Sequence, residues 1–220
     1  MARRSWLVPA AVAAGLLPLA KLAFDGATGG LGANPIQALL DRLGFWTLAM
    51  LTATLAAGPL NAQLGLAWPL RIRRALGLLT FGYATLHLVT YAGVDQALDL
   101  RAILADVVKR PFITVGFATF LVLLPLALTS TDAGVRRLGF RRWKRLHRLA
   151  YLAALGGVVH FIWRVKADLR QPVLFAVALG LLLLARLLPR RPAARTAGRA
   201  PRPRPGGEGG AAVGDTRPAG

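Results

Sequence analysis

The chain has 220 residues, of which 55% are hydrophobic and only 17% are charged. A soluble domain carries about 25% charged residues. Here the apolar residues form blocks of about 18 to 20, long enough to cross a hydrocarbon core as helices. The net charge of +19 does not indicate nucleic-acid binding, because the basic residues gather at the ends of the apolar blocks. The lack of cysteine excludes disulfides, iron–sulfur clusters and thiolate metal sites.

Six apolar segments predict an all-α, polytopic membrane protein built as a bundle of six transmembrane helices. A backbone exposed to lipid must satisfy its own hydrogen bonds, and these segments do not alternate as barrel strands would. The segments are 6–24, 43–60, 75–94, 112–129, 148–165 and 172–188. A signal peptide is the alternative for the first, which follows "MARRSW". We expect a retained helix, because the stretch is long and no convincing cleavage site follows it.

The polar segments predict the orientation of the bundle. Basic residues are concentrated at 71–74, at 136–148 and after residue 189, which places both termini in the cytoplasm. Residues 95–110 have apolar positions at helical spacing, which predicts a short interfacial helix on the outer side. We therefore expect one membrane domain over 1–188 and a disordered, Pro/Arg/Gly-rich cytoplasmic tail over 189–220.

The three histidines of the chain are the candidate functional residues: His87, His147 and His160. An ionisable residue inside a membrane span is costly and indicates function, although a neutral imidazole hydrogen-bonded between helices is the alternative for any one of them. His87 and His160 each lie about 12 residues into helices that run outward, so both reach about 18 Å from the inner boundary. Two imidazoles at one depth predict the axial ligands of a single haem iron. Such a centre transfers electrons, because neither axial position is left for a substrate.

A second, inner level follows from the spacing of the basic residues. His147 lies 13 residues before His160, and Arg74 lies 13 residues before His87. Thirteen residues turn a straight helix by about 140° from alignment, so the glycine pair at 156–157 is a candidate for a bend or π-bulge. Arg74 cannot bind iron but suits a haem propionate or a phosphate. His147 is either the ligand of a second haem with no histidine opposite, or a basic interfacial residue. Zinc and copper are disfavoured, because His147 lies too far along its helix to join the other two histidines.

Four stretches of the sequence resemble one known family. They are "GGLGANP", "RIRRALGLLTFGYATLHLVTY", "KRPFITVGF" and "LALTSTDAGVRRLGFRRWKRLHRLAY", the last followed by "VVHFIW". They are similar to the MsrQ (YedZ) family, the haem-binding membrane subunits of bacterial periplasmic methionine sulfoxide reductase systems, within the wider ferric-reductase-like transmembrane group. The resemblance covers roughly residues 10–188. It places the family's haem histidines on His87, His147 and His160, with Arg74 where the wider group has a fourth histidine.

The resemblance also implies a function. Members are b-type haem proteins of the bacterial inner membrane that pass electrons to MsrP, a periplasmic molybdopterin enzyme that repairs oxidised methionine in envelope proteins. It further implies quinol or a cytosolic flavin reductase as donor, and FMN as a further cofactor. We expect an electron-transfer subunit that pairs with MsrP as a heterodimer and does not reduce methionine sulfoxide by itself. The outer loops 25–42, 95–111 and 166–171 are the expected docking surface.

An FMN site has no signature of its own in this sequence, since no phosphate-binding glycine loop is present. The candidate phosphate contacts are basic residues of the inner loops: Arg71, Arg73, Arg74, Arg141 and Arg142. The alternatives to electron transfer are a cofactor-free membrane anchor and a small-solute transporter. A transporter would be expected to show inverted repeats, and the sequence shows no clear internal repeat.

Overall fold

The computed structural model describes residues 6–165 and 168–189, and every element in these ranges is a helix. Six helical segments are long and apolar enough to cross a membrane, as predicted. They comprise α1 (Leu7–Thr28), α2 (Pro35–Leu64), α3 (Trp68–Val89) with its π-helical extension η1 (Thr90–Asp95), α5 (Pro111–Leu128), α7 with α8 (Phe140–Leu146 and Leu149–Arg164), and α9 (Arg170–Leu187). The chain is an all-α polytopic membrane protein.

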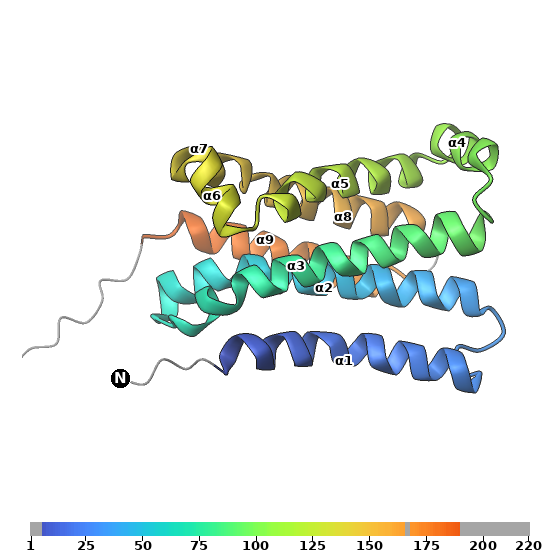
Figure 1. Cartoon of the computed structure of the whole chain (residues 1–220), viewed down its shortest axis with the longest axis horizontal. Coiled ribbons are helices and arrows are strands. Elements are labelled where there is room, and N and C mark those ends of the chain that lie inside the picture. Colours follow the sequence, from blue (N-terminus) through green and yellow to red (C-terminus); the bar gives the residue numbers. More distant parts are fainter. Residues whose placement is uncertain (1–5, 166–167, 190–220) are drawn as a thin grey trace, which may run out of the picture.

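Two antiparallel helix pairs, α2 with α3 and α5 with α8, form the centre of the bundle and share its most extensive contacts. Helix α2 also contacts α8 and α9, so it joins the two pairs (Figure 1). The buried residues at this junction are small or aliphatic, which lets the helices approach closely. Gly157 of α8, for example, lies against the Leu48 side chain of α2.

Helix α1 lies on the outside of the α2–α3 pair (Figure 1) and packs mainly on α3. The Tyr83 hydroxyl donates a hydrogen bond of 2.7 Å to the Gly15 carbonyl, and the Leu79 side chain covers Gly15. Because a side chain at position 15 would collide with Leu79, the glycine sets how closely α1 approaches α3. The first apolar segment is thus a packed helix of the bundle.

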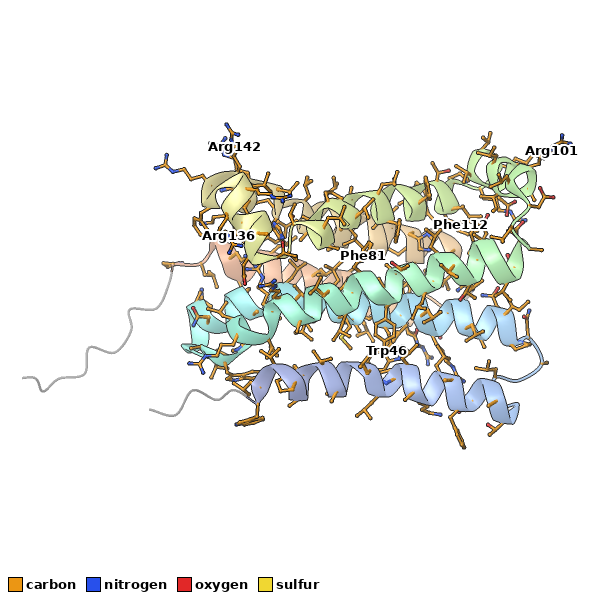
Figure 2. The ribbon with its side chains drawn as sticks, viewed as in Figure 1. Trp46, Phe81, Arg101, Phe112, Arg136 and Arg142 are labelled. Carbon is orange, nitrogen blue, oxygen red and sulfur yellow. The ribbon has the colours of Figure 1, made fainter. Side chains whose placement is uncertain are left out.

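The two ends of the bundle differ in charge and in their short helices. At one end, here called the α4 end, lie the α1–α2 loop, η1 and the helix α4 (Leu100–Lys109), which confirms the predicted short helix. At the other, the α7 end, lie α6 (Asp132–Leu138) and α7. Figure 2 shows Arg136 and Arg142 at the α7 end and Arg101 at the α4 end. The prediction treated the basic stretch 136–148 as a connection, whereas it is largely helical, and Thr131 caps α6 by accepting from the Gly134 N–H.

The expected irregularity at the glycine pair of α8 is not found. Helix α8 is continuous through Gly156 and Gly157, so these glycines do not introduce a bend. The helix is interrupted instead at His147 and Arg148, between α7 and α8, and the π-helix forms at Thr90–Asp95. Gly156 has a packing role, since an added Cβ would lie 2.2 Å from the Thr119 hydroxyl oxygen of α5.

Helix α9 is tied to α2 at a proline. Pro59 has no N–H, so the carbonyl of Leu55 lacks its usual donor four residues later. The Arg186 guanidinium of α9 donates to that carbonyl at 2.8 Å and lies 5.0 Å from the centre of the Tyr151 ring. Gly58 provides the space for the guanidinium. The Arg186 guanidinium inside the bundle thus stabilises α2 at the carbonyl that lacks a backbone donor.

Candidate functional site

Two of the three histidines face each other across the centre of the bundle. His87 projects from α3 and His160 from α8, so one comes from each helix pair. Their ring centroids are 6.1 Å apart and the ring planes are nearly perpendicular, at 89°. Both side chains are half-buried, and both lie toward the α4 end of their helices. The structure thus brings together the two imidazoles that the sequence analysis paired.

Each of these rings is fixed by one hydrogen bond to a backbone carbonyl. His87 Nδ1 lies 3.0 Å from the Leu40 carbonyl of α2, and His160 Nδ1 lies 2.7 Å from the Phe112 carbonyl of α5. A carbonyl only accepts, so Nδ1 donates its proton in both bonds and Nε2 carries the lone pair. Neither Nε2 has a hydrogen-bond partner within residues 6–165 and 168–189. Two nitrogen lone pairs are therefore available to bind a metal ion.

A glycine makes room for each ring. Gly44 follows Leu40 by four residues, and Gly116 follows Phe112 by four, so each glycine lies on the helix face above the accepting carbonyl. An added Cβ at 44 would lie 3.4 Å from the His87 ring, and one at 116 would lie 2.7 Å from His160 Nδ1. The absence of a side chain lets each imidazole reach a carbonyl that already belongs to a helix.

The two histidines are held by the same structural pattern. In each, a helix supplies a carbonyl and, four residues on, a glycine, and its antiparallel partner supplies the histidine. The carbonyl and histidine are 47 residues apart in the first pair and 48 in the second. Helices α2 and α5 run in the same direction, as do α3 and α8 (Figure 1), so the repeat is parallel, not inverted. The sequence analysis missed this repeat, because a backbone carbonyl can come from any residue type.

The donor set fits a haem iron. Metal–imidazole bonds are about 2.0–2.1 Å long, which, with about 1 Å from each nitrogen to its ring centre, gives an expected centroid separation near 6 Å. The observed centroid separation of 6.1 Å is close to this value. Within the described ranges, no group of three or more His, Cys, Asp or Glu side chains could enclose an ion by itself. A porphyrin brings four equatorial nitrogens of its own and needs only the two axial ones.

His147 lies at the junction of α7 and α8, away from the other two histidines. Its Nδ1 donates to the Trp143 carbonyl at 3.1 Å, and its ring stacks on the Trp143 indole at a centroid distance of 3.9 Å. Its Nε2 is 3.4 Å from the Ser130 oxygen, but that hydroxyl donates to the Leu126 carbonyl at 2.7 Å. The Ser130 hydroxyl proton is thus used elsewhere, and Nε2 has only a weak contact with Ser130.

Arg74 lies on the second turn of α3, at the α7 end. Its guanidinium forms an ion pair with Asp132 of α6, with 2.7 Å between Nη1 and Oδ1. Both side chains are more than half exposed. The structure therefore gives Arg74 an acidic partner that the sequence analysis did not foresee, while the fourth histidine is missing from the sequence itself.

Comparisons with known proteins identify the family of the chain. The family described as "Ferric reductase like transmembrane component" matches residues 43–158, a range that includes His87 and His147. A protein of Rhodospirillum rubrum is 53% identical over 188 residues, covering 84% of this chain and 89% of its own length. It is named the heme-binding subunit MsrQ of protein-methionine-sulfoxide reductase. The chain belongs to the MsrQ family.

Two further MsrQ proteins carry the same name. The one from Deinococcus radiodurans is 50% identical over 191 residues, covering 85% of this chain and 94% of its own length. The one from Azospira oryzae is 49% identical over 176 residues, covering 80% and 76%. The similarity thus extends over the membrane bundle, in agreement with the resemblance drawn from the sequence.

The basic residues predicted to contact a flavin phosphate all lie at the α7 end. Arg71 and Arg73 are on the first turns of α3, and Arg141 and Arg142 are on α7. A shallow hollow of about 300 Å³ is lined by Arg141 with neighbouring residues of the same stretch: Phe140, Lys144, Arg145 and Arg148. Lys144, Arg145 and Arg148 were not among the predicted contacts, although the sequence shows them as part of the basic stretch.

Sequence reasoning also missed an ion pair beside the histidines. Arg164 of α8 is paired with Asp41 of α2, and Asp41 also accepts from the Gln37 side chain at 2.9 Å. Asp41 directly follows Leu40, whose carbonyl holds His87. The signal available in the sequence was the spacing, since Arg164 lies one helical turn beyond His160.

Proposed function

We propose that this MsrQ family member is a b-type haem-binding electron-transfer subunit of a methionine sulfoxide reductase system. The observation that carries the proposal is the His87–His160 pair, with both Nδ1 protons committed to carbonyls and both Nε2 lone pairs available. The printed names of the relatives, which are heme-binding subunits, support it. The chain has no cysteine for a covalent thioether link, so the haem is held through axial ligands and packing.

The roles of the residues follow from this arrangement. When bound, haem supplies a one-electron carrier within the bundle. His87 and His160 are the residues that would hold it through their Nε2 atoms, and with both ligands supplied by the protein it would exchange electrons without binding oxygen or another substrate. The carbonyls of Leu40 and Phe112 fix the ring orientations and raise the basicity of the ligating nitrogens. The chain thus supplies ligands and local polarity, and we propose that it does not itself reduce methionine sulfoxide.

We propose a second, weaker haem level at the α7 end, held by His147 from one side. The donor pattern of His147 is that of a ligand, with Nδ1–H on a carbonyl and Nε2 loosely engaged. With three histidines in the chain, this level has no opposing imidazole. Arg74 is the candidate partner for a propionate, because an exposed ion pair such as that with Asp132 is weak and readily exchanged.

The proposed direction of transfer follows the charge asymmetry of the bundle. The basic α7 end is the cytoplasmic end in this proposal, with both termini inside and the protein in the bacterial inner membrane. Quinol or a flavin reductase delivers electrons there, and Arg71, Arg73, Arg141 and Arg142 are the proposed contacts for an FMN phosphate. The α4 end then faces the periplasm, where the loops 25–42 and 95–111 receive MsrP, the proposed molybdopterin-containing partner. The remaining docking segment, 166–171, includes residues outside those that the structure describes.

The test is an absorption spectrum of the detergent-purified protein from cells supplied with haem. We expect a sharp Soret band with α and β bands on reduction, and loss of most of this signal in His87→Ala and in His160→Ala. Thr85→Ala is the matched control, because that hydroxyl bonds only within its own helix, to the Phe81 carbonyl. A colourless wild-type protein would refute the proposal and favour the cofactor-free anchor or the transporter.

A further inference from the structure

The Arg164–Asp41 pair joins the two helix pairs directly beside the histidines. Arg164 is four residues after His160 on α8, so it lies on the same helix face one turn nearer the α4 end. Asp41 is on α2, next to the carbonyl that holds His87. The Arg164 side chain is 26% exposed and that of Asp41 is 45% exposed. A partly desolvated cation therefore lies at the α4 side of the proposed haem level.

The other ion pairs at this end are arranged differently. Arg42 is bound to Asp25, whose carboxylate also accepts two bonds from Lys21 at 2.9 Å. Asp25 is buried and thus fixes Arg42 on the α1 side of the bundle. Arg110 is paired with Asp106 of α4 at 3.2 Å. Arg164 alone among these arginines shares a helix face with a histidine of the pair.

The chemistry of haem supplies a reason for a cation at this position. A b-type haem carries two propionate carboxylates, and a carboxylate taken from water into a bundle needs a cation and hydrogen bonds. The guanidinium group offers two parallel N–H donors that match a carboxylate. In the structure the Asp41 carboxylate contacts Nη2 of Arg164 and also accepts from Gln37, so the guanidinium can stay on Asp41 while its other N–H groups meet a second carboxylate.

We propose that Arg164 binds a propionate of the haem held by His87 and His160, and that Asp41 holds the guanidinium in position. The inference rests on the proposed function, since it needs a haem at this level. A cation beside the iron favours the reduced state, which carries one positive charge fewer, whereas the Asp41 carboxylate favours the oxidised state. Arg164 is thus a cofactor-binding residue and Asp41 a positioning residue.

The test compares two variants that break the same ion pair. In Arg164→Gln we expect at least a tenfold loss of haem affinity and a lower midpoint potential. In Asp41→Asn the haem affinity changes less than threefold and the midpoint potential rises. A purely structural tie between α2 and α8 predicts instead that both variants shift occupancy and potential in the same direction. That outcome would overturn the inference.

A second arm removes the propionate charge from the ligand. Wild type and Arg164→Gln are loaded with haem and with haem dimethyl ester, and we expect their difference in affinity to vanish with the ester. An unchanged difference with the ester shows that Arg164 acts through the fold, and overturns the inference. Arg110→Gln is the matched control and should keep the affinity for both ligands, because its ion-pair partner Asp106 lies on α4, outside the helices that carry or hold the histidines.

The two failures are distinguishable. A wild-type protein that takes up neither haem nor the ester refutes the proposed function and the inference together. A wild-type protein with a histidine-dependent haem spectrum, beside an Arg164→Gln variant of unchanged affinity and potential, refutes the inference alone. Arg164→Lys, which keeps the charge but loses the paired donors, should recover the potential more fully than the affinity.

Discussion

The two histidine levels of the bundle differ in the number of histidines and in the groups that support them. At the level nearer the α4 end, His87 and His160 meet with their centroids 6.1 Å apart, and each ring has a glycine and a carbonyl on the neighbouring helix. At the level nearer the α7 end, His147 stacks on Trp143 of α7, and Arg74 of α3 is paired with Asp132 of α6. The first level therefore has a histidine on each of two facing helices and is called two-sided, whereas the second has a single histidine and is called one-sided.

The difference shows what a sequence repeat alone does not reveal. Both levels follow from one spacing of 13 residues along α3 and along the α7–α8 segment. Only the first has space cleared on the facing helix by Gly44 and Gly116. Each level also has an arginine–aspartate pair, but the Arg164 side chain is 26% exposed and that of Arg74 is 52% exposed. Haem affinity should therefore depend on the groups around the histidines as much as on the histidines themselves.

The glycines give the largest expected effect after the histidines themselves. In Gly116→Ala the new Cβ would lie 2.7 Å from His160 Nδ1, so the ring must move and lose its bond to the Phe112 carbonyl. Loss of such an outer partner weakens metal binding by about 10- to 100-fold. Gly44→Ala should cost less, because its Cβ would be 3.4 Å from the His87 ring. Haem titration followed at the Soret band measures both.

The control for these variants is Gly82→Ala on α3, where an added Cβ would meet nothing within 4 Å. Its haem affinity should equal that of wild type. If Gly116→Ala also binds haem as wild type does, the glycine does not position His160, and the repeat of carbonyl, glycine and histidine has no role at this level.

Much of the framework was predictable because it depends on composition and period. The six spans follow from apolar length, and the His87–His160 pairing follows from equal depth on helices that run the same way. The start of α2 at Pro35, eight residues before the predicted Leu43, was missed because polar residues there are satisfied across helices. Asp41, for example, is paired with Arg164, so the helix continues through charged positions.

The details of the site were less accessible for a related reason. The partners of His87 and His160 are backbone carbonyls, which leave no mark on residue type at Leu40 or Phe112. Gly44 and Gly116 are visible as glycines, but a glycine in a membrane helix usually indicates close packing alone. Gly156 illustrates that ambiguity, because it packs on Thr119 and the expected bend is absent.

His147→Ala tests whether the one-sided level holds a haem at all. We expect an iron-to-protein ratio near two in wild type and near one in the variant, with the six-coordinate spectrum of the His87–His160 level retained. A one-sided haem leaves an axial position open, so carbon monoxide should bind to reduced wild type and not to the variant. A ratio near one in both proteins would show that His147 is a basic interfacial residue.

The smallest expected effect concerns Arg74. Arg74→Gln breaks an exposed ion pair, so the free energy of unfolding should change by less than about 1 kcal/mol. If Arg74 binds a propionate at the one-sided level, this variant should weaken the second haem severalfold while the first is unaffected. Asp132→Asn breaks the same pair but keeps the guanidinium charge, so it should leave the second haem in place. Equal losses in the two variants would mean that the pair only anchors α6 to α3, and the two levels would then differ in their cations as well as in their rings.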